Sequence, residues 1–481
     1  MNQEIRVRFA PSPTGPLHIG GIRTAIFNYL FAKKHSGKFL LRIEDTDKQR
    51  SKDEYTKMIY EHLQWLGITW DEEPLFQSGN ISKHIENVHM LRKQKRAYYC
   101  YCSPDELAQM RKESEKQGKP FKYPRKCLNL TEENKAEFES KNTPKVVRFL
   151  IPEGSIEYND LIHGTITVNN SEIDDFIILR SDNTPTYQVA VVSDDCSMNI
   201  THVLRGDDHL SNTPKQILLY KALNFPIPRF GHVPLIVGVN KKKLSKRYGP
   251  VSIKDYRDDG ILPGALFNFL VLLGWAPGND QEFFSDSELL ELFSLESISK
   301  TNAVFDIKKL EWMNGKHISE KNNSELLPLI APIWIKYHMI SEKDVDENKS
   351  YLLKVINLLK SRVRKLTEFA EYGNYFFIDP SDFDESAQKK YWKETAKERL
   401  KELSGVLKPI TDFNEDTTEQ ALRKLAEAKS IGAGKYIHPA RLALTGFGVS
   451  PGLFEVMVLL GKESVLRRIE NAIEYLNKFQ Q

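Results

Sequence analysis

One segment combines the residue types that could hold a nucleotide phosphate: from Arg8 to Ala25 the chain reads RFAPSPTGPLHIGGIRTA. Alternating apolar and charged residues at its start predict a strand, and the prolines and glycines that follow forbid regular structure. Apolar residues then recur at helical spacing, so a helix opens at HIGG, and its free N–H groups and positive dipole end suit a phosphate. Gly20 and Gly21 would let a flat base approach the backbone, while His18 offers an imidazole donor beside the phosphates.

A second charged segment lies far downstream, where Lys241 to Arg247 read KKKLSKR. Five of its seven residues are basic, a composition that suits a loop closing over a triphosphate. A solvated basic turn is the plainer interpretation of such a charge run. Composition alone leaves both interpretations open.

Side chains that could hold a carboxylate and an ammonium group also occur near expected strand ends. Arginine pairs with a carboxylate through two parallel bonds, whereas an ammonium group calls for carboxylates and hydroxyls. Arg8 and Arg205 supply the first kind, and the second kind is supplied by Glu44, Ser12 and Tyr187. Ligands of Rossmann-type sheets sit at the carboxyl ends of the strands, so we expect these residues to face one crevice.

Each of these residues also has a plainer interpretation. Arg8 could be a charge at a strand edge, and Tyr187 could be a core residue. Arg205 could instead be the partner of Asp207 or Asp208. The hypothesis that they line one pocket depends on all of them lying at strand ends that face the same crevice.

Three of the four cysteines are grouped, at Cys100, Cys102 and Cys127. This spacing could place three thiolates around zinc, but a complete tetrahedral site needs a fourth ligand. Ordinary reduced thiols in a reducing compartment are the alternative.

Length and composition limit the class of protein. A chain of 481 residues is too long for one hydrophobic core, and 40% hydrophobic with 28% charged residues is ordinary for a globular protein. There is no run of 18 uncharged apolar residues and no signal-peptide core at the start, so we expect a cytoplasmic protein without a membrane segment. The net charge of +3 argues against a globally basic nucleic-acid binder, so local patches would have to hold such a partner.

The elements that must position these residues follow from periodicity. An expected strand at Phe39 to Ile43 after the first helix gives a strand–helix–strand unit of Rossmann type. Ser51 is expected to cap the next helix, with Glu54 completing a capping box. An insertion with alternating strands interrupts the pattern, which resumes at Tyr187, and the C-terminal third is helical by pattern. The fold class is therefore α/β, with a Rossmann-type domain, an α+β insertion and an all-helical C-terminal region.

Together these motifs resemble one family. HIGG resembles the "HIGH" signature of class I aminoacyl-tRNA synthetases, KKKLSKR resembles their "KMSKS" loop, and the PSPTG lead-in resembles the glutamyl-tRNA synthetase branch. Two further stretches resemble that branch, FDIKKLEWMNGKHI from Phe305 and LTGFGVSPGLFEVMVLLGKE from Leu444. The resemblance covers nearly the whole chain and implies ATP-dependent attachment of glutamate to tRNA(Glu) through a glutamyl-adenylate, with release of AMP and pyrophosphate.

The resemblance also implies five segments. Residues 1–84 and 187–249 would form the two halves of the Rossmann catalytic domain, and 85–186 a connective insertion for the tRNA acceptor end. Residues 250–320 would form a stem-contact domain, and 321–481 a helical anticodon-binding region.

Roles for single residues are implied in the same way, with Mg²⁺ neutralising the pyrophosphate. The expected catalytic residues are His18, Lys243 and Lys246. The expected ATP-binding residues are His18, Gly20, Gly21 and Lys246. The expected glutamate-binding residues are Arg8, Ser12, Glu44, Tyr187 and Arg205. On a basic helix, Arg362 fits the position associated with reading the third anticodon base and rejecting glutamine tRNA.

Some members of the family complete a zinc site with a tyrosine or a histidine near the third cysteine. Asn129 occupies the histidine position here, so the resemblance leaves Tyr123 as the fourth ligand of a structural Zn²⁺. The implied partners are tRNA(Glu), L-glutamate and ATP, and the expected state is a monomer.

Two other functions remain as alternatives. A catalytically silent tRNA-binding paralogue is disfavoured by the intact His18, Lys243 and Lys246. A truncated relative that glutamylates a modified tRNA base lacks the anticodon-binding region, and the long helical C-terminal third disfavours it. The sequence leaves open whether tRNA(Gln) is charged as well.

Overall fold

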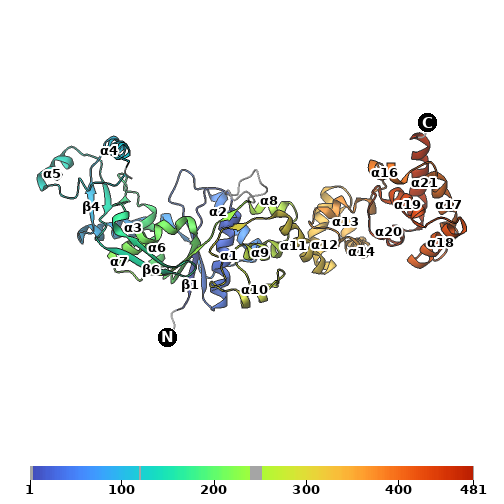
Figure 1. Cartoon of the computed structure of the whole chain (residues 1–481), viewed down its shortest axis with the longest axis horizontal. Coiled ribbons are helices and arrows are strands. Elements are labelled where there is room, and N and C mark those ends of the chain that lie inside the picture. The colour runs from blue at the N-terminus through green and yellow to red at the C-terminus, as the bar shows by residue number, and fades with distance from the viewer. Residues whose placement is uncertain (1–3, 119–120, 239–251, 480–481) are drawn as a thin grey trace. The chain divides into compact units, whose positions relative to one another are not determined.

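The computed structural model describes residues 4–118, 121–238 and 252–479, which belong to two compact units (Figure 1). Unit 1 comprises Met1–Asp255 and Leu266–Ile307, and unit 2 comprises Tyr256–Ala265 and Lys308–Gln481. The expected basic loop with Lys243 and Lys246 lies outside the described residues.

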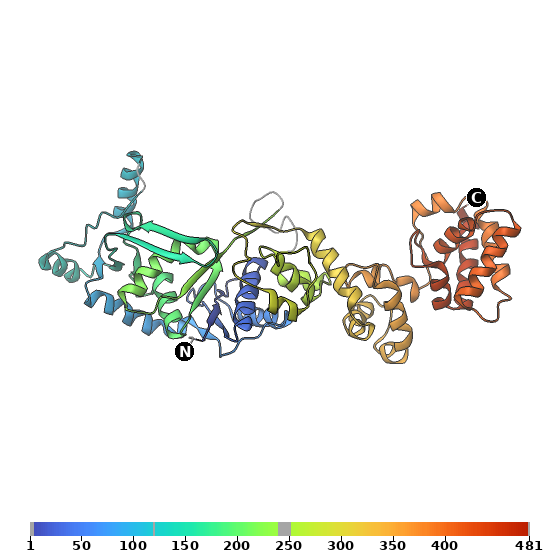
Figure 2. The same ribbon diagram turned by 60° about the horizontal axis from the view of Figure 1, so that its bottom comes forward.

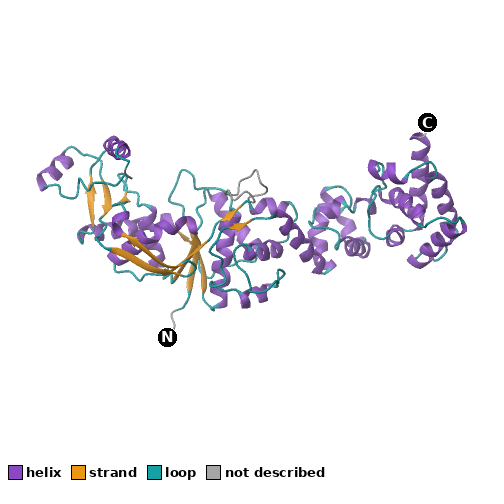
Figure 3. Cartoon of the chain, in the orientation of Figure 1, coloured by secondary structure: helices purple, strands orange, loops and turns teal. Residues whose placement is uncertain are grey.

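Parallel strands form the centre of unit 1 (Figure 3). They are β1 (Arg6–Phe9), β2 (Lys38–Ile43), β3 (Leu75–Phe76), β9 (His202–Gly206) and β10 (Arg229–Val233). Thr201, directly before β9, donates its N–H to the carbonyl oxygen of Arg6 in β1 at 2.9 Å. This contact joins the two parts of the sheet in the order β3–β2–β1–β9–β10, which is Rossmann order and confirms that prediction. Such a sheet binds its ligands where the order reverses, here between β1 and β9.

Helices cover this sheet, and α1 packs against β1, β2 and β9. The helices of unit 1 are α1 (Ile19–Lys34), α2 (Asp53–Trp65), α3 (Ile81–Lys93), α4 (Pro104–Lys116), α5 (Glu132–Ser140), α6 (Tyr187–Ser197), α7 (Thr213–Ala222) and α10 (Asp286–Leu292). Two more, α8 (Ile253–Asp258) and α9 (Pro263–Leu272), contain residues of both units. A short parallel pair, β11 (Ile236–Val237) and β12 (Ala303–Val304), completes unit 1.

The expected capping box at the start of α2 is wrong. The helix begins at Asp53, and its N-cap is Lys52, whose side chain makes no cap hydrogen bond. The N–H of Lys52 donates to the carbonyl oxygen of Pro13 at 3.1 Å, so the proline-rich loop holds the chain where it enters the helix. The Ser51 hydroxyl is buried without a partner among the described residues.

The α+β insertion is present, and part of it extends the main sheet. An antiparallel sheet is formed by β4 (Ala97–Cys100), β5 (Val146–Phe149) and β8 (Ile177–Leu179). The hairpin of β6 (Ser155–Asp160) and β7 (Gly164–Asn169) instead pairs with β10 through Asp160 and Phe230 (Figure 2). The end of β6 therefore reaches the same sheet as Arg205.

The regular secondary structure in the described part of unit 2 consists of helices, joined by turns and loops, as predicted for the C-terminal region. Its helices are α11 (Ile307–Glu320), α12 (Asn323–Lys336), α13 (Glu342–Glu347), α14 (Lys349–Leu359), α15 (Glu368–Glu371), α16 (Glu385–Tyr391), α17 (Ala396–Leu407), α18 (Glu415–Ala428), α19 (Gly434–Thr445), α20 (Leu453–Leu460) and α21 (Lys462–Phe479). They enclose two apolar cores, one around Trp334 and Phe369 and the other around Leu403 and Ile469. No helix in the described part of the chain is long and apolar enough to cross a membrane.

Candidate active site

The first helix begins at the residue that the sequence singled out. His18 is the N-cap of α1, and its Nδ1 accepts a hydrogen bond from the N–H of Gly21 at 3.2 Å. A Cβ on Gly20 would lie 3.1 Å from this Nδ1, so the glycine makes room for the imidazole. Because Nδ1 accepts, the neutral ring carries its proton on Nε2. No acidic residue occupies the first turn, which leaves the positive end of the helix suited to an anion.

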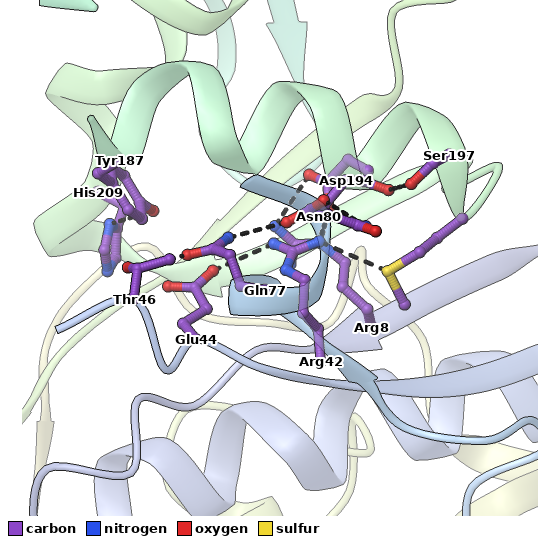
Figure 4. A network of polar contacts seen from close by, with 12 residues as sticks. Arg8, Arg42, Glu44, Thr46, Gln77, Asn80, Tyr187, Asp194, Ser197 and His209 are labelled. Carbon is purple, nitrogen blue, oxygen red and sulfur yellow. Dashed lines mark hydrogen bonds and ion pairs between the residues drawn. The ribbon is translucent and has the colours of Figure 1, made fainter. Parts of the chain in front are cut away.

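A buried ion-pair network connects the ends of β1 and β2 with α6 (Figure 4). Arg8 Nε lies 3.0 Å from Asp195 Oδ1, and Arg8 Nη2 lies 3.3 Å from Oδ2. Arg42 also pairs with Asp195, and its Nη2 lies 3.2 Å from Glu44 Oε1. Burial opposes ionisation of Asp195, but Arg42 and Arg8 outweigh it and lower its pKa to about 2. The carboxylate therefore occupies two of the donor groups of Arg8.

Burial raises the pKa of Glu44 above its usual value, although Arg42 opposes this shift. The N–H of Glu44 donates to the carbonyl oxygen of Pro11 at 3.0 Å, which ties the end of β2 to the loop before α1. Ser12 on this loop is exposed, and its carbonyl oxygen accepts from the N–H of Thr14. No described contact brings Ser12 into the ion-pair network.

A second carboxylate on α6, that of Asp194, binds three polar side chains from the segment after β3 and from α3. Asp194 accepts from Gln77 Nε2 at 3.0 Å and from Asn80 Nδ2 at 2.9 Å, and it lies 2.8 Å from His84 Nε2. Sequence reasoning missed the roles of Arg42, Asp194 and Asp195. The available signal was a pair of adjacent carboxylates inside an otherwise apolar helix, since such groups are buried only when paired.

Arg205, near the end of β9, is held by neutral groups. The residue is 6% exposed, its Nη2 donates to Thr213 Oγ1 at 2.8 Å, and its Nε donates to His232 Nε2 at 3.2 Å. Its Nη1 is buried without a partner among the described residues. Burial lowers the pKa of Arg205, and the positive charge of Arg8 adds to this effect. A buried guanidinium with a free donor is costly unless an anion completes it.

The two aspartates that follow Arg205 have other partners. Asp207 Oδ1 lies 2.8 Å from His163 Nε2, and Asp208 Oδ2 lies 3.9 Å from His209 Nε2. Neither forms an ion pair with Arg205 in the described part of the chain. The plainer interpretation of Arg205 as their partner is therefore wrong.

Tyr187 begins helix α6, so its expected place at a strand end is wrong. Its hydroxyl lies 3.2 Å from His209 Nδ1, and burial raises its pKa, with Glu44 contributing. Figure 4 shows Tyr187 and His209 beside Glu44 and Thr46. Tyr187 lies close enough to Glu44, Arg8 and Arg205 for their charges to act on its hydroxyl, so these four expected residues share one region. His18 lies at the start of α1.

Arg362 lies in unit 2, and the expectation of a basic helix around it is wrong. Helix α14 ends at Leu359, and Arg362 follows in a turn in which its N–H donates to the carbonyl oxygen of Leu359 at 2.8 Å. Its side chain is exposed. Nearby Lys365 is paired with Asp259 and Glu311, so it adds less free positive charge than the sequence suggested.

The three grouped cysteines meet in the insertion. Their Sγ atoms all lie within 4.8 Å of one another, and those of Cys102 and Cys127 are 3.7 Å apart. The hydroxyl of Tyr123 lies 3.3 Å from Cys100 Sγ and 3.5 Å from Cys102 Sγ. Zn–S bonds of about 2.3 Å and a Zn–O bond of about 2.0 Å place tetrahedral ligand atoms about 3.8 Å and about 3.5 Å apart, respectively. The four side chains therefore fit a zinc ion, and Asn129 is exposed.

The chain matches two family models. The model of the tRNA synthetases class I (E and Q), catalytic domain, matches residues 4–312, and an anticodon binding domain matches residues 325–473. These matches define a class I tRNA synthetase with an N-terminal Rossmann-like domain and a helical C-terminal domain.

Similar proteins narrow the class further. The chain is 44% identical to a glutamate–tRNA ligase of Thermoanaerobacter pseudethanolicus and 45% identical to one of Syntrophus aciditrophicus, over 99% and 98% of both chains, respectively. A crystal structure of a glutamate tRNA ligase from Elizabethkingia meningosepticum, in complex with its amino acid, has a TM-score of 0.90 at 35% identity and covers 98% of this chain and 100% of that one. The chain therefore belongs to the glutamate–tRNA ligase family of the class I tRNA synthetases.

Proposed function

We propose that this protein attaches glutamate to tRNA(Glu) in two steps. The carboxylate of glutamate attacks the α-phosphate of ATP and releases pyrophosphate, and a terminal hydroxyl of the tRNA then attacks the glutamyl-adenylate and releases AMP. Neither step needs a protein nucleophile, so catalysis is positioning and stabilisation of charge on phosphoryl oxygens. Relatives named as glutamate–tRNA ligases that match over nearly their full length support this reaction.

The observation that carries the choice of amino acid is the incomplete pairing of Arg205. Its Nη1 is buried and has no partner within residues 4–118, 121–238 and 252–479, and its bonded neighbours Thr213 and His232 carry no carboxylate. The side-chain carboxylate of glutamate would supply the missing acceptor as a charge-assisted bond. Arg8 donates to Asp195 and adds positive potential, while Glu44 and Tyr187 offer acceptors to the α-ammonium group.

We place ATP at the start of α1. His18 Nε2–H and the N–H groups of the first turn would donate to phosphate oxygens, beside Gly20 and Gly21. Mg²⁺ would neutralise the pyrophosphate. The assignment of Lys243 and Lys246 to the same phosphates rests on the resemblance to the family, because both lie outside the described residues.

The remaining assignments are proposals with separate support. The distances among Cys100, Cys102, Cys127 and Tyr123 support a structural zinc, which would fix the insertion. The match of residues 325–473 to an anticodon binding domain supports tRNA contact by unit 2, and exposed Arg362 is our proposed reader of the anticodon. The division at 84, 186, 249 and 320, the monomeric state and the cytoplasmic location stay predictions.

A charging assay tests the proposed function. We expect the pure protein, with ATP, Mg²⁺ and labelled glutamate, to charge a tRNA(Glu) transcript, and omission of ATP to abolish the product. A tRNA(Gln) transcript in a parallel reaction reports whether that tRNA is charged too. Binding of tRNA(Glu) without any charging would identify a silent paralogue and refute the proposal.

A further inference from the structure

A group of buried polar side chains stands directly behind Arg205. Asp160 ends β6 in the insertion hairpin, His232 lies on β10, and Thr213 begins α7. Asp160 is 1% exposed, and the other two are fully buried. The three residues come from segments that are distant in the sequence; His232 and Thr213 contact the guanidinium of Arg205, and Asp160 contacts His232.

Their contacts form a chain from a carboxylate to Arg205. Asp160 Oδ2 lies 2.6 Å from His232 Nδ1, and His232 Nε2 lies 3.2 Å from Arg205 Nε. Thr213 Oγ1 lies 3.0 Å from His232 Nε2 and accepts from Arg205 Nη2 at 2.8 Å. Asp160 Oδ1 meanwhile accepts from the N–H groups of Ile162 and His163, both at 2.9 Å.

The partners determine the tautomer of His232. A guanidinium can only donate, so His232 Nε2 must accept from Arg205 Nε and cannot carry a proton. The ring proton therefore resides on Nδ1, where it is donated to Asp160. The carboxylate keeps its charge because Oδ1 is already held by backbone N–H donors, and its pKa is below the usual value despite burial. Burial and the charge of Arg205 likewise lower the pKa of His232 and favour the neutral ring.

We propose that Asp160 and His232 are positioning residues that set the specificity for glutamate by orienting Arg205. This inference rests on the proposed function of Arg205 as the partner of the substrate side chain. Asp160 fixes the ring and its tautomer, His232 and Thr213 hold Nε and Nη2, and Nη1 is left to face the substrate carboxylate. Because Asp160 belongs to the insertion hairpin, the insertion contributes to the glutamate pocket through His232 and Arg205.

The substitution Asp160→Asn tests the tautomer. The amide oxygen would stay on the backbone N–H donors, so the amide NH₂ would face His232 Nδ1 and force it to accept. The ring proton would move to Nε2 and point at the N–H of Arg205, as happens when a triad aspartate becomes asparagine. We expect the KM for glutamate to rise about 10- to 100-fold, the range of a lost hydrogen bond to a charged group, with the KM for ATP nearly unchanged.

Two substitutions of His232 separate positioning from simple support of the fold. The amide oxygen of His232→Gln can replace Nε2 as the acceptor for Arg205, whereas His232→Asn reaches only the Nδ1 position. We expect the glutamine variant to keep a KM for glutamate closer to that of the parent than the asparagine variant does. His202→Gln, which removes a buried histidine at the other end of β9, is the matched control and should leave this KM unchanged.

A measurement on the unsubstituted protein does not depend on the stability of any variant. With ¹⁵N-labelled histidine, the His232 resonances, assigned by their loss in His232→Gln, should show a protonated Nδ1 and an unprotonated Nε2. An Nε2–H tautomer, or equal glutamate KM values for Asp160→Asn and the parent, would overturn the inference. Failure of the parent to charge glutamate at all would instead reject the proposed function, so the two failures are distinct.

Discussion

Removing Arg205 should abolish most of the selectivity for glutamate. The guanidinium can offer Nη1 and a second donor to the substrate carboxylate, and a hydrogen bond between charged groups contributes about 1.5–3 kcal/mol. Two such bonds correspond to about 3–6 kcal/mol, so Arg205→Ala should lower kcat/KM for glutamate by about 10²- to 10⁴-fold. Thr213 Oγ1 and His232 Nε2 lie 3.0 Å apart and can still pair with each other, so we expect the fold to persist.

Glutamine sharpens the same test, because its neutral amide is nearly isosteric with the carboxylate of glutamate. In the unsubstituted protein, the buried positive charge of Arg205 has no negative partner when glutamine binds, which weakens glutamine binding. Arg205→Ala removes this penalty. In Arg205→Ala the KM for glutamate should therefore rise and the preference for glutamate over glutamine should shrink. Arg205→Lys should keep only part of this preference, because an ammonium cannot make the bidentate pair. Steady-state charging with both amino acids measures these ratios.

A matched control removes a buried arginine elsewhere. Arg468 in α21 is 4% exposed and is held by Asp379 and the carbonyl oxygen of Leu444, so Arg468→Ala should change stability without changing the ratio of glutamate to glutamine charging. If Arg205→Ala keeps both the parent's glutamate KM and its preference, the reasoning about the unpaired Nη1 is refuted.

Two further predictions concern the insertion and the dependence of stability on pH. Elemental analysis should find about one zinc per chain in protein purified without chelators. Cys127→Ser should lose this zinc, whereas Cys196→Ser should keep it. Absence of zinc from the unsubstituted protein would contradict the assignment. Burial lowers the pKa of His202 to about 4 from 6.5, so the unfolded chain takes up this proton first as the pH falls. The stability that neutral His202 contributes is complete above pH 6.5, and about 3 kcal/mol of it should be lost between pH 6.5 and 4. His202→Gln should flatten that part of the pH profile in thermal unfolding, and an unchanged profile would exclude this histidine as the cause.

Much of the local structure was predictable because it depends on short-range patterns. The proline-rich loop ends at His18, the strand expected at Phe39 to Ile43 is present, and the three grouped cysteines converge. In each case the decisive residues are neighbours in sequence, or their types alone restrict the chemistry. Family resemblance added that a catalytic domain precedes an anticodon-binding domain, which periodicity could not supply.

The failures arose where tertiary contacts override local preference. Ser51 and Glu54 have the pattern of a capping box, yet the hydrogen bond from Lys52 to Pro13 fixes the chain so that the helix begins later. Tyr187 begins an apolar run that is compatible with either a strand or a helix, and burial on nearly all sides gives it no clear period.

The sequence does not reveal which partners the two arginines of the proposed pocket have. Arg8 and Arg205 looked equivalent in the sequence, since both were expected at crevice-facing strand ends and both could bind a carboxylate. The structure separates them by their partners: Arg8 is matched by Asp195, which is 187 positions away, whereas Arg205 is held by a hydroxyl and a neutral imidazole. Burial makes this difference matter, because a charge that is already paired has little to gain from a ligand, while an unmatched one gains the full interaction. We therefore expect selectivity to reside in the arginine whose protein partners are neutral, and to depend on the tautomer that Asp160 imposes on His232.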